Sequence, residues 1–413
     1  MKKVIMISYR FPPFAGAGVF RTLKFVKYLP DFNWKPLVVS ANSSKFAPID
    51  KTLLDEVSNK ANVFRTYTVE SKVYRYLPSI VGINRKWYQV PDVFIGWIPF
   101  ALLKAKKVVK KEKPNVIYST SPPITSHLIA MLLKGKTGLP WVADFRDPWT
   151  DNMLVSYPTN FHRKIEEKIE HKIGKYADSI IFTMDSHMNH FLKKYPDISP
   201  KKCVYINNGY DHEDFEDIKV NKSKVFTLTY VGSFYNNITP IFLLQALKKI
   251  IAKNKINRKK FRVMFIGKKS KEYQNLIHDF GLNDIIKEIG YVSHKEAIIY
   301  MLSSSCLFFI IGLGKRSEWV YSGKIFEYMA SGTPIIATVP ERSVVRDLIK
   351  ETNTGVIIDT DDVDGIEHEV LNHYKKWEEG KLGIQPKWDI IKKYERKNLT
   401  EKLVEVFNNL FIC

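Results

Sequence analysis

The sequence predicts two α/β domains, each built on a parallel sheet. Short apolar runs rich in β-branched and aromatic residues are each followed by turn residues and a helical pattern, as in parallel α/β layers. The pattern pauses at a polar, lysine-rich stretch, 217–224, and then starts again. The chain has 413 residues, enough for two large domains, and we expect their boundary within 209–224.

The expected strands follow in order along both halves. In the first half they cover 3–8, 34–40, 114–119, 141–144, 179–183 and 203–207. In the second half they cover 226–232, 261–267, 306–312, 333–337 and 355–358. Apolar residues at helical spacing in 388–411 predict one or two terminal helices. We expect domains 1–208 and 209–387, with the terminal helices of 388–413 belonging to the first.

Composition excludes several classes of protein. Apolar residues make up 45% and charged residues 26%, which is not typical of a disordered, collagen-like or coiled-coil chain. Cys203, Cys306 and Cys413 lie far apart, which argues against a disulfide framework and a structural zinc site. The first apolar run is too short for a secretory signal, and no run is long enough to span a membrane. We therefore expect a protein of the cytoplasm.

The net charge of +21 predicts an anionic partner. Residues 1–200 carry +15 of it. The helical stretch 102–113 follows the aromatic residues Phe94, Trp97 and Phe100. This combination favours an anionic membrane surface, at the inner face of the plasma membrane, over an ordinary solvated helix face. Nucleic acid is not expected, because no binding module accompanies the charge. The stretch contains six lysines: Lys104, Lys106, Lys107, Lys110, Lys111 and Lys113.

The segment 322–337 has the most specific pattern in the chain. A loop rich in glycine and charge leads to Ser322, a good N-cap, then to an amphipathic helix that Gly332 ends and a strand follows. Gly323 and Lys324 in the first helical turn predict a binding site for phosphate. Glu327, one turn further on, is placed to accept hydrogen bonds from ribose hydroxyls. This part of the sequence predicts a nucleotide site.

The segment 323–337, GKIFEYMASGTPIIA, resembles the signature helix of the GT-B glycosyltransferases, in particular the retaining family 4. Other similar segments are PPFAGAGVFR at 12–21, STSPP at 119–123, ADFRDPW at 143–149, INNGYD at 206–211, YVGS at 230–233 and GYVSH at 290–294. The SPP and RDPW loops are similar to those of the subgroup that builds bacterial surface polysaccharides. The resemblance implies two doubly wound Rossmann-like domains facing across a cleft, with C-terminal helices packing back toward the first.

The resemblance also implies a reaction. A sugar would pass, with retention of configuration, from a nucleotide-diphosphate sugar to a glycan or lipid-linked saccharide, without a metal or cofactor. No carboxylate nucleophile stands out, which favours attack on the face from which the leaving group departs, assisted by its phosphate. Two alternatives stay open: a GT-B scaffold without activity, and a GT-B epimerase or phosphorylase.

The expected donor site draws on both halves of the chain. Glu318 is one position away from the family's usual spacing before Glu327. Ser233 stands where the family usually has an arginine, so Lys324, Lys268 or Arg316 must supply positive charge. The complete set of expected donor residues is Gly16, Gly18, Ser233, Lys268, Tyr291, Arg316, Glu318, Ser322, Gly323, Lys324 and Glu327.

Arg146 and Asp147 are the expected catalytic residues. They follow a strand end, and ligands bind at the carboxyl ends of strands in open α/β sheets. The resemblance implies that Asp147 contacts the acceptor or orients the sugar. Arg21, one turn into the first helix, would contact a phosphate or lie in solvent, and His127 is expected to pack inside an apolar helix face.

Overall fold

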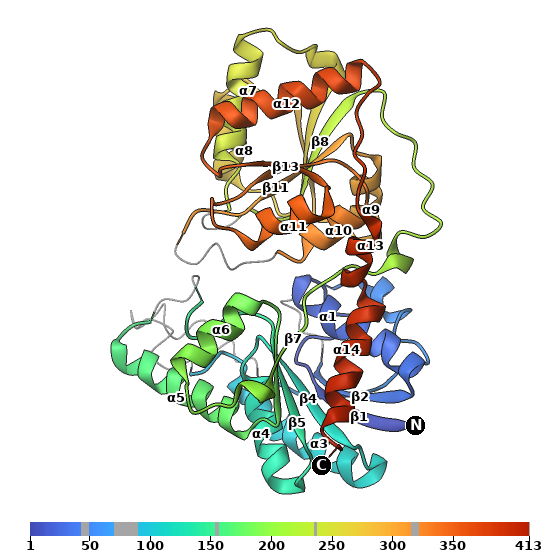
Figure 1. Cartoon of the computed structure of the whole chain (residues 1–413), viewed down its shortest axis with the longest axis vertical. Coiled ribbons are helices and arrows are strands. Elements are labelled where there is room, and N and C mark those ends of the chain that lie inside the picture. Colours follow the sequence, from blue (N-terminus) through green and yellow to red (C-terminus); the bar gives the residue numbers. More distant parts are fainter. Residues whose placement is uncertain (43–48, 70–89, 153–156, 235–237, 315–321, 413) are drawn as a thin grey trace. The chain divides into compact units, whose positions relative to one another are not determined.

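The computed structural model divides the chain into two compact units (Figure 1). The first unit comprises Met1–Asn208 and Arg396–Cys413, and the second comprises Gly209–Glu395. The structure describes all residues except 43–48, 70–89, 153–156, 235–237, 315–321 and 413. Arg316 and Glu318 therefore lie outside the described residues.

The described residues of the first unit form a seven-stranded parallel sheet of order β3-β2-β1-β4-β5-β6-β7. The strand order reverses between β1 and β4, which is the point where open α/β sheets bind ligands. The strands are β1 (Lys2–Ile7), β2 (Trp34–Ala41), β3 (Asn62–Thr66), β4 (Val116–Ser121), β5 (Trp141–Phe145), β6 (Ser179–Phe182) and β7 (Cys203–Tyr205).

Helices cover both faces of this sheet. Alternate residues of β1 show the two faces, because Ile5 and Ile7 pack in one apolar cluster while Val4 and Met6 pack in the other. The first face is covered by α3 (Ile98–Glu112), α4 (Thr125–Thr137), α5 (Asn160–Tyr176) and α6 (Asp185–Lys194). The second face is covered by α1 (Ala17–Tyr28) and α14 (Arg396–Asn409).

The second unit repeats this architecture. Its described residues form a six-stranded parallel sheet of order β10-β9-β8-β11-β12-β13, again with a reversal, here between β8 and β11. The strands are β8 (Phe226–Val231), β9 (Phe261–Ile266), β10 (Ile286–Gly290), β11 (Cys306–Ile310), β12 (Ile335–Thr338) and β13 (Gly355–Ile358). One face carries α7 (Ile241–Ala252), α8 (Lys271–Asp279) and α12 (Val363–Glu378). The other carries α9 (His294–Ser303), α10 (Lys324–Ala330), α11 (Val344–Thr352) and α13 (Trp388–Ile391).

The terminal helices divide between the units. Leu403 and Phe407 of α14 are fully buried in the first unit against α1, as expected. The expectation that all of 388–413 belongs to the first domain is wrong for α13, because Ile391 is buried in an apolar cluster of the second unit, beside α11. Burial of this single apolar side chain requires a neighbouring apolar face, which α11 supplies.

Candidate functional site

Two glycines bring the ends of β8 and β9 together in the second unit. Gly232 has φ 144° and Gly267 has φ 153°, a backbone region that favours glycine. A Cβ atom on Gly267 would lie 2.2 Å from the Gly232 carbonyl oxygen. The backbone N–H of Lys268 donates to Ser233 Oγ over 3.1 Å. The loops after the two strands are therefore tied together at the carboxyl edge of the sheet.

Lys324 extends its side chain to this edge. A Cβ atom on Gly232 would lie 1.8 Å from Lys324 Nζ, so the ammonium occupies the space that a larger residue would fill. Nζ also lies 4.9 Å from the centre of the Tyr230 ring. Burial lowers the pKa of Lys324 to about 8, against the opposing effect of Glu327. The site thus holds a partly buried cation beside the end of β8.

The helix that carries Lys324 begins later than its sequence pattern predicts. Its N-cap is Gly323, which makes no side-chain cap, and Ser322 lies one residue earlier, so the prediction of Ser322 as N-cap is wrong. The Ser322 carbonyl instead accepts from the N–H of Ile325 over 3.0 Å, which satisfies a donor of the first turn. Tyr328 Oη accepts from the N–H of Val231 over 2.8 Å and fixes α10 to the end of β8.

Glu327 lies one turn after Lys324 and contacts a residue of another helix. His294 Nε2 lies 2.9 Å from Glu327 Oε1, and His294 Nδ1 lies 3.9 Å from Asp214 Oδ2. Asp214 ends a short 3₁₀ helix, His212–Asp214, whose N-cap Asp211 accepts from the N–H of Glu213. Sequence reasoning gave no role to His294, Asp214 or Tyr328.

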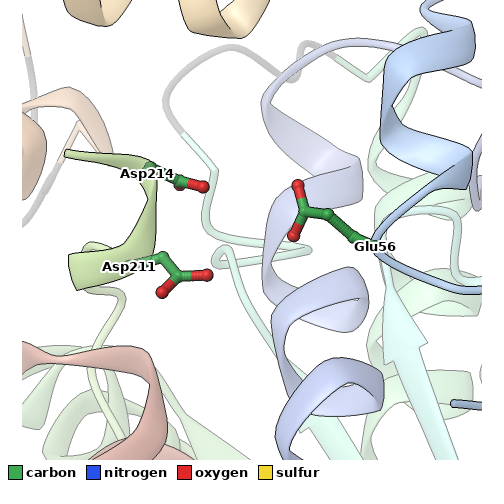
Figure 2. Close-up of side chains that lie close together, drawn as sticks. All are labelled: Glu56, Asp211 and Asp214. Carbon is green, nitrogen blue, oxygen red and sulfur yellow. The ribbon is translucent and has the colours of Figure 1, made fainter. Parts of the chain in front are cut away.

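Figure 2 shows Asp211 and Asp214 together with Glu56. Glu56 belongs to the first unit, where its carboxylate lies 2.7 Å from Lys24 Nζ. Because these carboxylates come from different units, we assign no metal site to them.

The other expected donor residues fall into separate groups. Lys268 and Tyr291 are exposed and follow β9 and β10 at the same edge as Gly232. Gly16 and Gly18 lie in the first unit, where Gly16 is the N-cap of α1 with φ 104°. The structure therefore brings Ser233, Lys324 and the loop of Lys268 together within the second unit, whereas Gly16 and Gly18 belong to the first unit.

Arg146 follows the end of β5, as expected. Its side chain is buried, and its guanidinium donates to the carbonyls of Ser121 (2.8 Å) and Pro122 (2.7 Å) and to that of Gly18. Buried guanidinium groups require such acceptors. Arg146 therefore joins three loops at the carboxyl edge of the first sheet.

Asp147 is exposed beside it. The loop that follows is held from α5, because Trp149 Nε1–H donates to Glu166 over 2.7 Å and Thr150 Oγ1–H donates to Glu170 over 2.5 Å. An exposed carboxylate thus lies on a loop with buried anchors on both sides.

Arg21 and His127 are both buried. Arg21 makes two hydrogen bonds to Asp144, of 2.9 and 3.0 Å, so neither expected role, phosphate contact or solvent exposure, is correct. His127 is fully buried, with Nδ1 2.8 Å from Ser119 Oγ, and burial lowers its pKa to about 3. The prediction of a packing histidine is confirmed.

The lysine-rich stretch forms α3. Lys107, Lys110, Lys111 and Lys113 are exposed, whereas Lys104 and Lys106 are partly buried. Trp97 is fully buried and donates from Nε1 to Thr66 Oγ1 over 2.6 Å, so its expected contribution to a membrane-binding surface is wrong. Exposed apolar side chains lie near the start of the helix instead. We call Tyr67, Val69, Val93, Ile95 and Leu103 the apolar patch.

The fold and the glycine-lined edge define a class of protein, a two-domain α/β protein of the GT-B type. Residues 22–214 match the model of Glycosyltransferase Family 4, and residues 225–376 match that of Glycosyl transferases group 1. The two matches together span more than half of the chain, and both models describe glycosyltransferases. The chain is therefore a glycosyltransferase of the family 4 type.

Solved structures share the fold. Sucrose-phosphate synthase from Thermosynechococcus elongatus is 13% identical, with a TM-score of 0.70 and complete coverage of both chains. HepE from Anabaena in complex with UDP-glucose is 13% identical, with a TM-score of 0.68, covering 99% of this chain and 100% of that one. A putative UDP-N-acetylglucosamine 2-epimerase from Listeria monocytogenes is 12% identical, with a TM-score of 0.61, covering 100% and 97%. The search of curated proteins found no match.

Proposed function

We propose that this glycosyltransferase moves a hexosyl group from a nucleotide-diphosphate sugar to a glycan or lipid-linked saccharide of the cell surface, with retention and without a metal or cofactor. One observation supports binding of the donor: a partly buried cation, Lys324, lies beside the end of β8, and the carboxylate of Glu327 follows it one helical turn later. HepE, of the same fold, was solved with UDP-glucose and with UDP.

The two side chains suit different parts of a donor. Lys324 would neutralise the charge that develops on the departing diphosphate, which stabilises the transition state. Lys324 would supply the positive charge that is missing at Ser233, where the family usually has an arginine. This supports an active enzyme over the alternative of an inactive scaffold. Glu327 would accept hydrogen bonds from the ribose hydroxyls, and the glycine at 232 allows the diphosphate to approach the backbone.

On the acceptor side we propose that Asp147 contacts the acceptor or the transferred sugar. It is the exposed carboxylate of a firmly held loop at the ligand-binding edge of the first sheet. Gly16, Gly18 and Arg146 would shape the same edge.

We also propose that the apolar patch and the exposed lysines of α3 hold the protein at an anionic membrane, where a lipid-linked acceptor would be found. No helix in the described ranges is long and apolar enough to cross a bilayer. The ring of Tyr67 packs edge-on against Phe100 at 5.1 Å, and a Cβ atom on Gly96 would lie 3.2 Å from that of Val69. Tyr67 and Val69 therefore lie against the start of α3, and the later turns of this helix carry the lysines.

The donor assignment is tested by calorimetry with UDP, GDP, ADP and dTDP. Glu327→Ala should raise the Kd of the nucleotide that binds best by roughly 10- to 150-fold, about 1.5–3 kcal/mol, as for a lost hydrogen bond to a charged group. Glu351→Ala, at an exposed position of α11, is the matched control. A folded Glu327→Ala protein with unchanged affinity would show that the ribose role is wrong.

Analysis of products separates the alternatives. A transferase releases the nucleoside diphosphate when donor and acceptor are mixed, an epimerase returns a different nucleotide sugar with no net release, and a scaffold does neither. Detection of the released nucleotide with a crude lipid-linked saccharide fraction as acceptor is the decisive measurement.

A further inference from the structure

The carboxylate of Glu327 is held by a side chain from another helix. His294 is the first residue of α9, and a capping box fixes the start of that helix. Ser293 Oγ accepts from the N–H of Glu296, and Glu296 Oε2 accepts from the N–H of Ser293 over 2.8 Å. The backbone of His294 is therefore well defined, and its imidazole reaches α10, 33 residues further along the chain.

The imidazole lies between two carboxylates. Its Nε2 is 2.9 Å from Glu327 Oε1 and its Nδ1 is 3.9 Å from Asp214 Oδ2. The side chain of His294 is only 12% exposed, against 20% for Glu327 and 16% for Asp214. An ionised carboxylate only accepts hydrogen bonds, so we assign the hydrogen bond as Nε2–H donating to Glu327 Oε1.

A carboxylate can accept more than one hydrogen bond, because its two oxygens offer about four acceptor positions, and His294 contacts Oε1. A free glutamate side chain loses rotamer entropy when a ligand fixes it, which weakens binding. A glutamate that is already oriented avoids that loss, and this benefit appears in affinity for the ligand and not in the chemical step.

We propose that His294 is a positioning residue for donor recognition: it holds the Glu327 carboxylate in the orientation that accepts the ribose hydroxyls. The proposal rests on the proposed role of Glu327. Asp214 Oδ2 lies 3.9 Å from Nδ1, the other ring nitrogen.

Three variants test this role: His294→Ala, His294→Gln and, as a matched control on the same helix, Lys295→Ala. Lys295 is exposed at the next position of α9. The probe is the best-binding nucleotide of UDP, GDP, ADP and dTDP, with calorimetry for Kd and the corresponding sugar nucleotide for KM and kcat. His294→Ala should raise Kd and KM by about 5- to 10-fold and leave kcat within about twofold. His294→Gln, which keeps an N–H donor, should restore most of the affinity, and Lys295→Ala should behave as the wild type.

A double-mutant cycle with Glu327→Gln separates this inference from the proposed function. If His294 acts through Glu327, His294→Ala should cost little further affinity once Glu327 is changed. The positioning role alone would be overturned if the losses of affinity from the two substitutions multiplied fully in the double variant. It would also be overturned if His294→Ala and His294→Gln, both folded, lost the same affinity. Unchanged nucleotide binding by Glu327→Ala would overturn the ribose role and this inference with it.

Discussion

At the scale of single residues, the proposed role of Lys324 predicts that nucleotide binding depends on pH. Burial lowers its pKa to about 8 in the unoccupied protein, so the positive charge is present below that pH and is lost as the pH rises through it. A diphosphate binds the charged form, and we expect its Kd to rise by up to about tenfold per pH unit above pH 8.

Lys324→Arg is the informative comparison, because a guanidinium keeps its charge at high pH. Its Kd should change little between pH 7 and pH 9.5, whereas that of the wild type rises. Calorimetry with UDP across this range measures both. A wild-type Kd that stays constant to pH 9.5 would show that Lys324 does not bind the phosphates.

The residues of the candidate site that could be predicted are those that belong to a local sequence pattern. Lys324 and Glu327 stand in one short motif, and their positions near a strand end follow from it. His294 and Tyr328 act through contacts with segments 33 and 97 residues away, which no local pattern encodes. Arg146 shows the same limit, because the sequence placed it at a strand end but could not show that three carbonyls would take its hydrogen bonds.

At the scale of elements, the loop after β5 carries two neighbouring residues, Arg146 and Asp147, that we expect to have different roles. Arg146 points into the protein and Asp147 is exposed. Asp147→Asn keeps the size of the side chain and removes its charge, so we expect turnover to fall at least about tenfold while the Kd for nucleotide stays within about twofold. Initial rates of nucleotide release with saturating donor measure this.

The neighbouring position provides the contrast. Arg146→Ala should lower the thermal midpoint of unfolding, because it leaves buried carbonyls without donors, whereas Asp147→Asn should not. Full turnover by a folded Asp147→Asn protein would remove Asp147 from the reaction.

The strands that sequence reasoning missed are β3 and β10, and each lies at an edge of its sheet. Interior strands are covered on both faces and read as continuous apolar runs, which is why β1, β8 and β11 were predicted. β3 is mostly half-buried and β10 contains the exposed Lys287, so their apolar signal is weak. The sequence also could not show that α13 belongs to the second unit and α14 to the first. Both helices have apolar residues at helical spacing, and only their packing partners differ.

At the scale of the whole molecule, the net charge of +21 matters through its position. Four exposed lysines lie on α3 and at its end, beyond the apolar patch. Each lysine near an anionic bilayer contributes about 1 kcal/mol, within a Debye length of about 8–10 Å at moderate salt. Exposed apolar side chains beside such charges add burial at the interface. The protein should therefore bind anionic vesicles through this surface.

The prediction is tested with two variants of equal net charge. In one, Lys107, Lys110, Lys111 and Lys113 become glutamate. In the other, four exposed lysines of the second unit become glutamate: Lys255, Lys259, Lys260 and Lys381. Co-sedimentation with vesicles of phosphatidylcholine and phosphatidylglycerol should show a partition coefficient about 10³-fold lower for the α3 variant and near the wild-type value for the other. Binding by the wild type should weaken as salt rises. Equal losses in both variants would mean that total charge, and not the surface of α3, governs attachment.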